Sequence, residues 1–240
     1  MGCMMNDFES FENGIRIYTQ KGQFPVGTDS ILLSSFVRLR ANARVLDLGC
    51  GAGTLGLLLC GRNSTCRALG IELQEQACLL AQRNAAYNGL EERMQILQGD
   101  LRQYRDLIAP GSYTAVVCNP PYFPVGSGKA AQGSLRQARM EQSCTLPELC
   151  CCAAWSLQFG GAFFLVHRPE RLADLIYWLR QSQLEPKRIQ FVRHRASAGV
   201  SLVLLESRLG GRPGLTYETD LVLFHPDGSP TAQYRDIYHI

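Results

Sequence analysis

Short apolar runs alternate with helical patterns through the middle of the chain. The apolar runs have the length of a strand and occupy residues 44–48, 67–73, 94–98 and 113–119. Between them, residues 54–62 and 75–89 carry apolar positions at helical spacing. Strands that alternate with helices in this way are typical of a parallel sheet covered on both faces.

The alternation continues after the polar stretch that ends near residue 144. Thr145 is a suitable N-cap for a helix that runs to Gln158, before a break at Gly160 and Gly161. The following elements are predicted to be a strand at 161–167, a helix at 169–183, and strands at 187–194 and 200–207. The turn between the last two strands is short, so that pair must be antiparallel. We therefore expect an α/β fold with a mainly parallel seven-stranded sheet, an antiparallel last strand, and helices on both faces.

Changes in this pattern divide the chain into three parts. Residues 1–40 are expected to form an N-terminal cap over cofactor and substrate, with a helix that begins at a capping Asp29. Residues 41–210 form the α/β core, and residues 211–240 form a C-terminal extension of a strand and a turn.

The composition favours an enzyme-sized cytoplasmic protein. The chain has 240 residues, 46% of them hydrophobic, which is sufficient for one large α/β domain. No apolar window approaches the length of a membrane span, and the first residues lack the pattern of a secretory signal. The ten cysteines include no pair of CxxC clusters, so we expect buried thiols in a reducing compartment and no metal site.

Positive charge is concentrated near the C-terminus of the core. The net charge is only +3, but residues 186–212 contain six lysines and arginines and one acid, Glu206. This segment would suit contacts with phosphates, and a solvated basic face is the alternative.

A glycine-rich loop follows the first strand of the core. Gly49, Gly51 and Gly53 lie in VLDLGCGAGTLG, where absent side chains let backbone N–H groups approach a ligand. The spacing GxGxG differs from the GxGxxG of dinucleotide-binding loops, and Asp47 just before it would repel a pyrophosphate. A cofactor with a cationic amino-acid end and no phosphate fits better, and S-adenosyl-L-methionine is the common one. Cys50 lies inside this loop without a nearby histidine, and we interpret it as a small filler.

Acidic residues stand at the ends of the next two strands. Glu72 is placed to accept hydrogen bonds from both ribose hydroxyls, and Asp100 could accept from the exocyclic amine of an adenine. Each acid alone could be a helix cap or a solvent contact. Together with Asp47 and the glycine loop, they predict a site for a nucleoside cofactor.

The fourth strand ends in VVCNPPYFPVG, which predicts a hydrogen-bond acceptor loop. Asn119 should emerge at the carboxyl edge of the sheet, while Pro120 and Pro121 fix the backbone and remove N–H groups. The Asn119 amide oxygen and the Pro120 carbonyl can both accept from one planar NH₂ group and aim its nitrogen at an electrophilic methyl. Tyr122, with Phe123, offers a face for stacking of the ring that carries this amine. The alternative is a proline-rich turn with packed aromatic rings.

Taken together, DLGCGAG, Glu72, Gly99-Asp100 and NPPY resemble the class I S-adenosylmethionine-dependent methyltransferases that act on planar NH₂ groups. The resemblance covers about residues 20–210 and implies a Rossmann-like fold. FPVGTDSILLSSF and LRQARMEQSCTLPEL are further similar to the tRNA adenine-N6 methyltransferases that act on the adenine beside the anticodon of a valine tRNA. In that family the GTD segment helps to close over the cofactor, which implies this role for Thr28 and Asp29. Residues 186–240 cannot be matched to the family one by one.

The resemblance gives the long stretch 124–143 a role. Lys129, Arg136 and Arg139 are expected to grip tRNA phosphates while the target adenine is turned out of its stack. A disordered, solvated loop is the alternative.

Three other functions remain open from the sequence. Glutamine-N5 protein methyltransferases use the same NPPY geometry but carry a longer region before the glycine loop. DNA adenine methyltransferases usually need a sizeable target-recognition region, for which this chain leaves little room. A non-catalytic cofactor-binding or RNA-binding module should have a broken acceptor loop, whereas this one is intact. The sequence leaves open whether the protein acts as a monomer or a homodimer.

Overall fold

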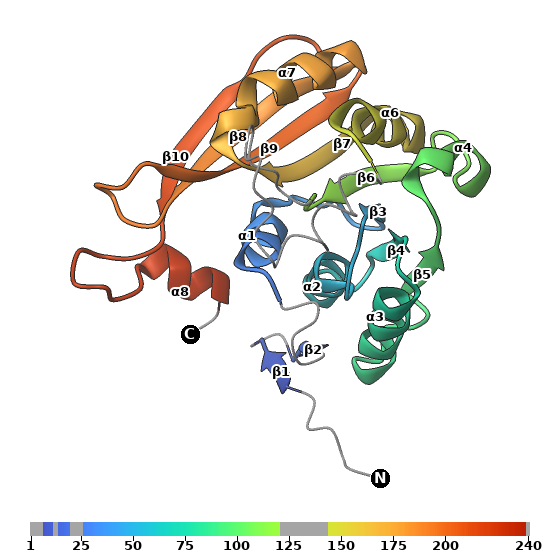
Figure 1. Ribbon diagram of the computed structural model, residues 1–240, viewed down its shortest axis with the longest axis horizontal. Coiled ribbons are helices and arrows are strands. Elements are labelled where there is room, and N and C mark those ends of the chain that lie inside the picture. The colour runs from blue at the N-terminus through green and yellow to red at the C-terminus, as the bar shows by residue number, and fades with distance from the viewer. Residues whose placement is uncertain (1–6, 12–13, 20–25, 121–143, 239–240) are drawn as a thin grey trace, which may run out of the picture.

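An eight-stranded sheet forms the centre of the computed structural model, which describes residues 7–11, 14–19, 26–120 and 144–238 (Figure 1). Its strands lie in the order β10-β8-β9-β7-β6-β3-β4-β5. Their bounds are β3 Arg44–Leu48, β4 Arg67–Glu72, β5 Met94–Gln98, β6 Tyr113–Cys118, β7 Leu157–His167, β8 Leu184–Arg193, β9 Val200–Leu209 and β10 Thr216–Val222. β9 is antiparallel to both of its neighbours, and the other pairs are parallel.

The predicted fold class is confirmed, but the predicted number of strands is wrong. β10 comes from the segment expected to be a separate extension, and it pairs in parallel with β8 at the edge of the sheet. The short turn before β9 does make an antiparallel pair, as predicted. β9 lies between β7 and β8, because the chain passes β7 to form β8 and then returns.

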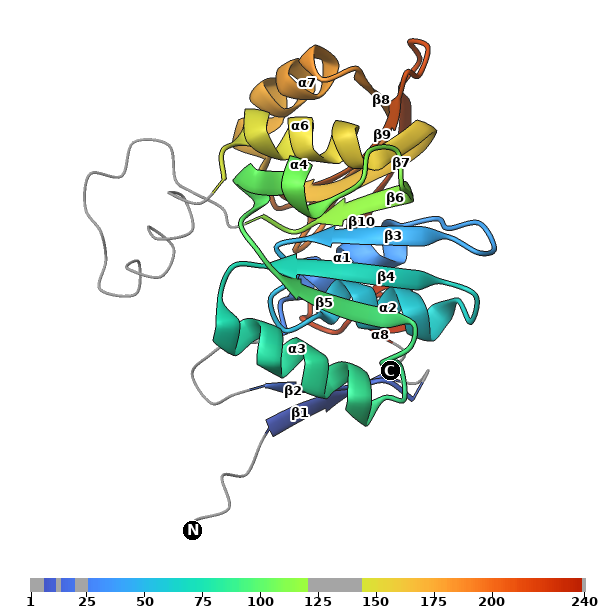
Figure 2. The same ribbon diagram turned by 90° about the vertical axis from the view of Figure 1, so that its right-hand side faces the viewer.

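Helices cover both faces of this sheet (Figure 2). One face packs against α1 Thr28–Phe36, α2 Thr54–Arg62 and α3 Glu75–Tyr87. The other packs against η1 Leu101–Gln103, α4 Tyr104–Leu107, α6 Leu146–Ser156 and α7 Leu172–Gln181, with η2 Pro169–Arg171 leading into α7. Adjacent residues of β7 serve opposite cores, Phe164 on the α1–α3 side and Phe163 on the α6–α7 side, both fully buried. This alternation follows from the period of two of a strand. In the described part of the chain, no helix is long and apolar enough to cross a membrane.

Two helix starts differ in how they are capped. Thr145 caps α6 as predicted, and the Glu148 carboxylate accepts from its backbone N–H at 2.7 Å and its hydroxyl at 2.8 Å. The predicted cap of α1 is wrong, because Gly27 is the N-cap and Asp29 lies in the first turn. An acid there still favours the positive end of the helix.

The expected break at Gly160 and Gly161 is an irregularity within a strand. β7 already begins at Leu157, and its pairing with β6 shifts register between Tyr113 and Ala115. Gly160 has φ +76°, and a Cβ on Gly161 would lie 2.8 Å from the Gln158 carbonyl oxygen. The glycines therefore allow a bulge instead of ending the element.

Asn84 in α3 and Asn88 at its C-cap attach the N-terminal hairpin, made of β1 Asp7–Ser10 and β2 Arg16–Thr19. The Asn84 amide accepts from the Tyr18 N–H at 2.9 Å and donates to the Tyr18 carbonyl at 3.1 Å. It also donates to the Ala52 carbonyl in the glycine loop at 3.1 Å. The Asn88 amide likewise accepts from the Arg16 N–H at 2.8 Å and donates to the Arg16 carbonyl at 2.7 Å. The hairpin is thereby fixed beside the loop that the sequence assigns to a cofactor.

Candidate active site

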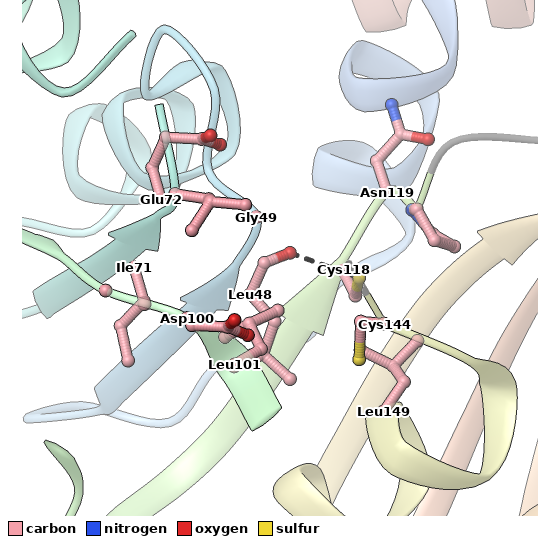
Figure 3. A pocket seen from close by; sticks show the side chains of 13 residues that line it. Leu48, Gly49, Ile71, Glu72, Asp100, Leu101, Cys118, Asn119, Cys144 and Leu149 are labelled. Atoms are coloured by element: carbon pink, nitrogen blue, oxygen red, sulfur yellow. Dashed lines mark hydrogen bonds between the residues drawn. The ribbon is translucent and has the colours of Figure 1, made fainter. Parts of the chain in front are cut away.

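A pocket opens at the carboxyl ends of β3 to β6 (Figure 3). The polar side chains that line it are Glu72, Asp100 and Asn119. Apolar lining comes from Leu48, Ile71 and Leu149. Gly49 and Pro120 also line it, so the structure brings together residues predicted from four separate strand ends. Ligands of open α/β sheets bind at this edge.

The glycines of the loop after β3 have backbone conformations that other residues rarely adopt. Gly49, Gly51 and Gly53 have φ values of +71°, +55° and +84°. Gly53 is also packed tightly, since a Cβ there would lie 2.7 Å from Met94 Cε and 3.3 Å from Ala81 Cβ. The loop thus needs glycine for its backbone path, and at Gly53 for space as well.

Glu72 holds this loop from the neighbouring strand. Its side chain is buried, with Oε2 accepting from the Gly51 N–H at 3.0 Å and Oε1 from the Gln74 N–H at 2.9 Å. A carboxylate has about four lone-pair sites, so both oxygens keep capacity for a ligand in the pocket. The contact with Gly51 was not foreseen, because it depends on the packing of β4 beside β3.

Asp47 lies beneath the loop and does not line the pocket. It is buried, its Oδ2 accepts from the Gly56 N–H at 3.3 Å, and its Oδ1 has no hydrogen-bond partner among the described residues. Burial raises the pKa of this carboxyl to about 7; the Gly56 N–H opposes the rise and the charge of Glu72 adds to it. Its expected contact with a cofactor amine stays a prediction.

Asp100 is an ionised acceptor at the wall of the pocket. Arg102 donates to it from Nη2 at 2.5 Å and from its backbone N–H at 2.9 Å. The Arg102 side-chain hydrogen bonds hold the pKa of this carboxyl below its usual value. Arg102 was missed in the sequence, although it stands only two residues away.

Asn119 follows β6 and points its amide nitrogen at α1. The nitrogen donates to Ser30 Oγ at 2.8 Å. Ser30 belongs to the same helical turn as Thr28 and Asp29, neither of which lines the pocket. The helical turn that carries Thr28 and Asp29 therefore contacts the site through Ser30, which the sequence did not single out.

The rest of the predicted acceptor loop and its cations lie outside the described residues. These positions are Pro121, Tyr122, Phe123, Lys129, Arg136 and Arg139. Their roles stay predictions.

Cys50 is buried beside the site, and Cys144 lines the pocket half-buried. A Cβ on Gly70 would lie 2.6 Å from Cys50 Sγ, which confirms that this thiol fills space. Burial raises the pKa of Cys50, and it raises that of Cys144, which lines the pocket, to about 12. Among the described residues, no three histidine, cysteine or acidic side chains are grouped as metal ligands.

Three arginines of the basic segment 186–212 form ion pairs within the protein. Arg188 is buried, donates to Glu206 at 2.8 Å and to the Phe36 carbonyl at 2.6 Å, and lies 3.7 Å from the Phe36 ring centre. The other paired arginines are Arg193 with Asp220 at 2.5 Å and Arg208 with Glu206 at 2.8 Å. The expected contact with phosphates is therefore wrong for the buried Arg188, and it stays a prediction for the more exposed cations of the segment.

Comparison with known proteins identifies relatives of the chain. The model of the methyltransferase small domain family matches residues 15–176. The tRNA1(Val) (adenine(37)-N6)-methyltransferase of Dickeya chrysanthemi is 35% identical over 89% of this chain and 87% of its own. The protein of the same name from Parabacteroides distasonis is 31% identical over 85% and 84%.

Solved structures agree on the fold. A predicted O-methyltransferase from Agrobacterium tumefaciens superposes with a TM-score of 0.71 at 21% identity, covering 88% of this chain and 96% of that one. A transferase from Pyrococcus horikoshii gives a TM-score of 0.61 at 14% identity, with coverage of 86% and 72%. At these identities, the similarity shows the fold alone.

Proposed function

The chain belongs to the methyltransferase small domain family, and from this premise we propose that it methylates N6 of an adenine in tRNA. S-adenosyl-L-methionine is the methyl donor. The observation that carries the proposal is one pocket lined by Glu72, Asp100, Asn119 and Pro120. It combines acceptors for a nucleoside cofactor with acceptors for a planar amine.

The residues present fit this cofactor. The glycine loop leaves open space at Gly49 and Gly51, where an added Cβ would meet no atom within 4 Å. Glu72 would hold the ribose hydroxyls and Asp100 the adenine amine, each through its carboxylate oxygens. Asp47 Oδ1, buried and without a partner among the described residues, is an acceptor for the cationic end. When bound, the cofactor supplies an electrophilic methyl group on a sulfonium.

Asn119 and Pro120 position the nucleophile. The Asn119 amide oxygen and the Pro120 carbonyl accept the two hydrogens of the adenine N6 amine and orient its nitrogen. Both acceptors stabilise the more cationic amine of the transition state, in which the nitrogen lone pair is no longer delocalised. No strong base is required, because the amine becomes acidic as the new N–C bond forms. Tyr122, with Phe123, would stack on the adenine ring.

The names of the relatives support tRNA as the substrate and the adenine beside the anticodon of a valine tRNA as the target. Lys129, Arg136 and Arg139 are proposed to hold the tRNA phosphates. Arg195, in the exposed turn after β8, stands at the carboxyl edge of the sheet together with the pocket. Lys187 and Arg212 lie at the opposite edge, where the Lys187 ammonium donates to the Arg212 carbonyl at 3.0 Å. Binding should therefore depend more on Arg195 than on these two cations.

The proposed division of the chain has residues 1–40 as a cap, 41–210 as the methyltransferase core and 211–240 as an extension that adds β10 to the sheet. We place the reaction in the cytoplasm, where tRNA is the available substrate.

A methyl-transfer assay tests the function. The protein is incubated with labelled S-adenosylmethionine and with total tRNA, total protein or DNA, and the products are digested. N6-methyladenosine from tRNA is the expected product. N5-methylglutamine, or N6-methyladenine in DNA alone, would replace the proposal with another target, and no transfer to any of them would reject catalysis.

The salt dependence of tRNA binding tests the phosphate contacts. Affinity should fall steeply as salt rises, because bound cations release the counterions of the RNA. An affinity that does not change with ionic strength would contradict these contacts.

A further inference from the structure

The hydroxyl of Ser30 differs from those of the other serines in α1. Ser34 and Ser35 each donate to a carbonyl of their own helix, Ile31 and Leu32 respectively, at 2.7 Å. This local bond is the usual one for serine within a helix. The Ser30 Oγ instead accepts from the Asn119 amide nitrogen at 2.8 Å, across 89 residues of sequence.

This contact favours one of the two orientations of the Asn119 amide. The last torsion of asparagine is broad and roughly two-fold, so the nitrogen and the oxygen can exchange places at little steric cost. Neighbours that accept or donate hydrogen bonds therefore determine the orientation. In the structure the Ser30 hydroxyl accepts, so the nitrogen lies on the α1 side and the oxygen on the other arm of the planar group (Figure 3).

We propose that Ser30 is a positioning residue, which holds the Asn119 amide so that its oxygen accepts from the target amine. The inference rests on the proposed function of Asn119. Without Ser30, the flipped amide would present its NH₂ to the NH₂ of the substrate, and two donors would meet. The bond to Ser30 also polarises the amide and makes its oxygen a better acceptor.

The start of α1 is itself held in place by the C-terminal segment. The Tyr238 side chain lies near that of Thr28, two residues before Ser30. Tyr238 belongs to α8 Ala232–Tyr238 and stacks on Tyr234 at 4.4 Å between ring centres; Tyr234 packs on Phe224 at 4.9 Å. The first turn of α1, which carries Ser30, thereby packs against the C-terminal helix α8.

Substitutions of Ser30 test the proposal. Ser30→Ala removes the acceptor and Ser30→Cys weakens it at nearly the same volume. Both should lower kcat for tRNA methylation roughly 3- to 10-fold, the effect of one neutral hydrogen bond. KM for tRNA and Kd for S-adenosylhomocysteine should stay within about two-fold, since a misoriented amide changes the reacting geometry and not the cofactor contacts.

Matched variants separate positioning from packing. Ser35→Ala removes a hydroxyl from the same helix that donates to the carbonyl of Leu32, and kcat should not change. Ser30→Thr retains a hydroxyl and should restore most of kcat. A kcat of Ser30→Ala equal to that of the unsubstituted protein, or equal losses in Ser30→Ala and Ser35→Ala, would overturn the proposal.

A spectroscopic readout keeps the test independent of methylation. The side-chain amide resonances of Asn119, assigned through Asn119→Asp, should shift in Ser30→Ala because one proton loses its acceptor. Unchanged resonances would overturn the proposal. If the unsubstituted protein methylates no RNA, the proposed function fails, and this NMR comparison alone decides whether Ser30 orients the amide.

Discussion

Glu72 Oε2 accepts a hydrogen bond from the backbone N–H of Gly51 at 3.0 Å, so the acid that ends β4 holds the glycine loop that follows β3. Glu72 and the glycine loop, predicted as separate parts of a cofactor site, are thus joined by a hydrogen bond. A change at Glu72 should alter both the ribose contact and the shape of the loop.

Glu72→Gln should weaken cofactor binding about 10- to 100-fold. Both carboxylate oxygens accept backbone N–H bonds, and the glutamine NH₂ would face one of these donors. Hydrogen bonds to a charged group contribute about 1.5–3 kcal/mol. Titration calorimetry with S-adenosylhomocysteine measures the loss, with the exposed Glu75→Gln in α3 as the control. Equal affinities of both variants would show that Glu72 does not bind the cofactor.

Asn119→Ala should abolish most turnover while leaving the cofactor bound. Removal of one preorganised transition-state contact costs about 100- to 1000-fold in kcat. The Kd for S-adenosylhomocysteine should change by less than about three-fold, because the cofactor is held mainly by other strand ends. Single-turnover methylation and calorimetry on the same preparation measure both quantities. Comparable losses in the two would make Asn119 a structural residue.

Asp47 should make the apo protein less stable as the pH rises. Its pKa is about 7 when folded against an ordinary value of 3.8, so between these values the folded protein keeps a proton that the unfolded chain releases. The free energy of unfolding then falls with pH over this window, by at most about 1.4 kcal/mol per pH unit, and levels off above it. Urea unfolding from pH 4 to 8 should show this slope, and Asp47→Asn should lack it. Identical slopes in both proteins would contradict the raised pKa.

Gly53→Ala should destabilise the protein more than Gly51→Ala. Both positions have positive φ, but only a Cβ at Gly53 would crowd its neighbours, at 3.3 Å from Ala81 Cβ and 2.7 Å from Met94 Cε, which would have to shift. We expect a loss of about 2–4 kcal/mol at Gly53, from backbone strain and overpacking, and about 1–2 kcal/mol at Gly51, from strain alone. Chemical denaturation of the two variants measures the difference. Equal losses would mean that packing around Gly53 adapts freely.

Arg188→Leu should cost about 3–5 kcal/mol in stability. The substitution leaves the Glu206 carboxylate, which is 6% exposed, without its main buried partner. Arg212→Leu, at an exposed position of the same basic segment, should stay within about 0.5 kcal/mol. Urea unfolding compares the pair. A stable Arg188→Leu would show that this arginine is not a structural element.

The sequence by itself determined the elements and the strand ends of this protein. The bounds predicted for β3, α2 and β5 agree with the structure because apolar periodicity and glycine conformation act over a few residues. For the same reason Glu72, Asp100 and Asn119 could be placed at one edge, since parallel strands that each lead into a helix end there. The predicted tail strand, β10, was not expected to join the sheet, because its partner β8 is not adjacent in the chain. The hairpin of β1 and β2 was not predicted.

Only the tertiary structure decided which residues form hydrogen bonds with residues far away in the sequence. Ser30 meets Asn119, Asn84 meets Tyr18, and Arg188 reaches the Phe36 carbonyl across 89, 66 and 152 residues respectively. Such pairs depend on the order of strands in the sheet and on how helices pack over it, which no local pattern encodes. A basic segment that looked like a surface for phosphates therefore became, through Arg188, part of the buried framework.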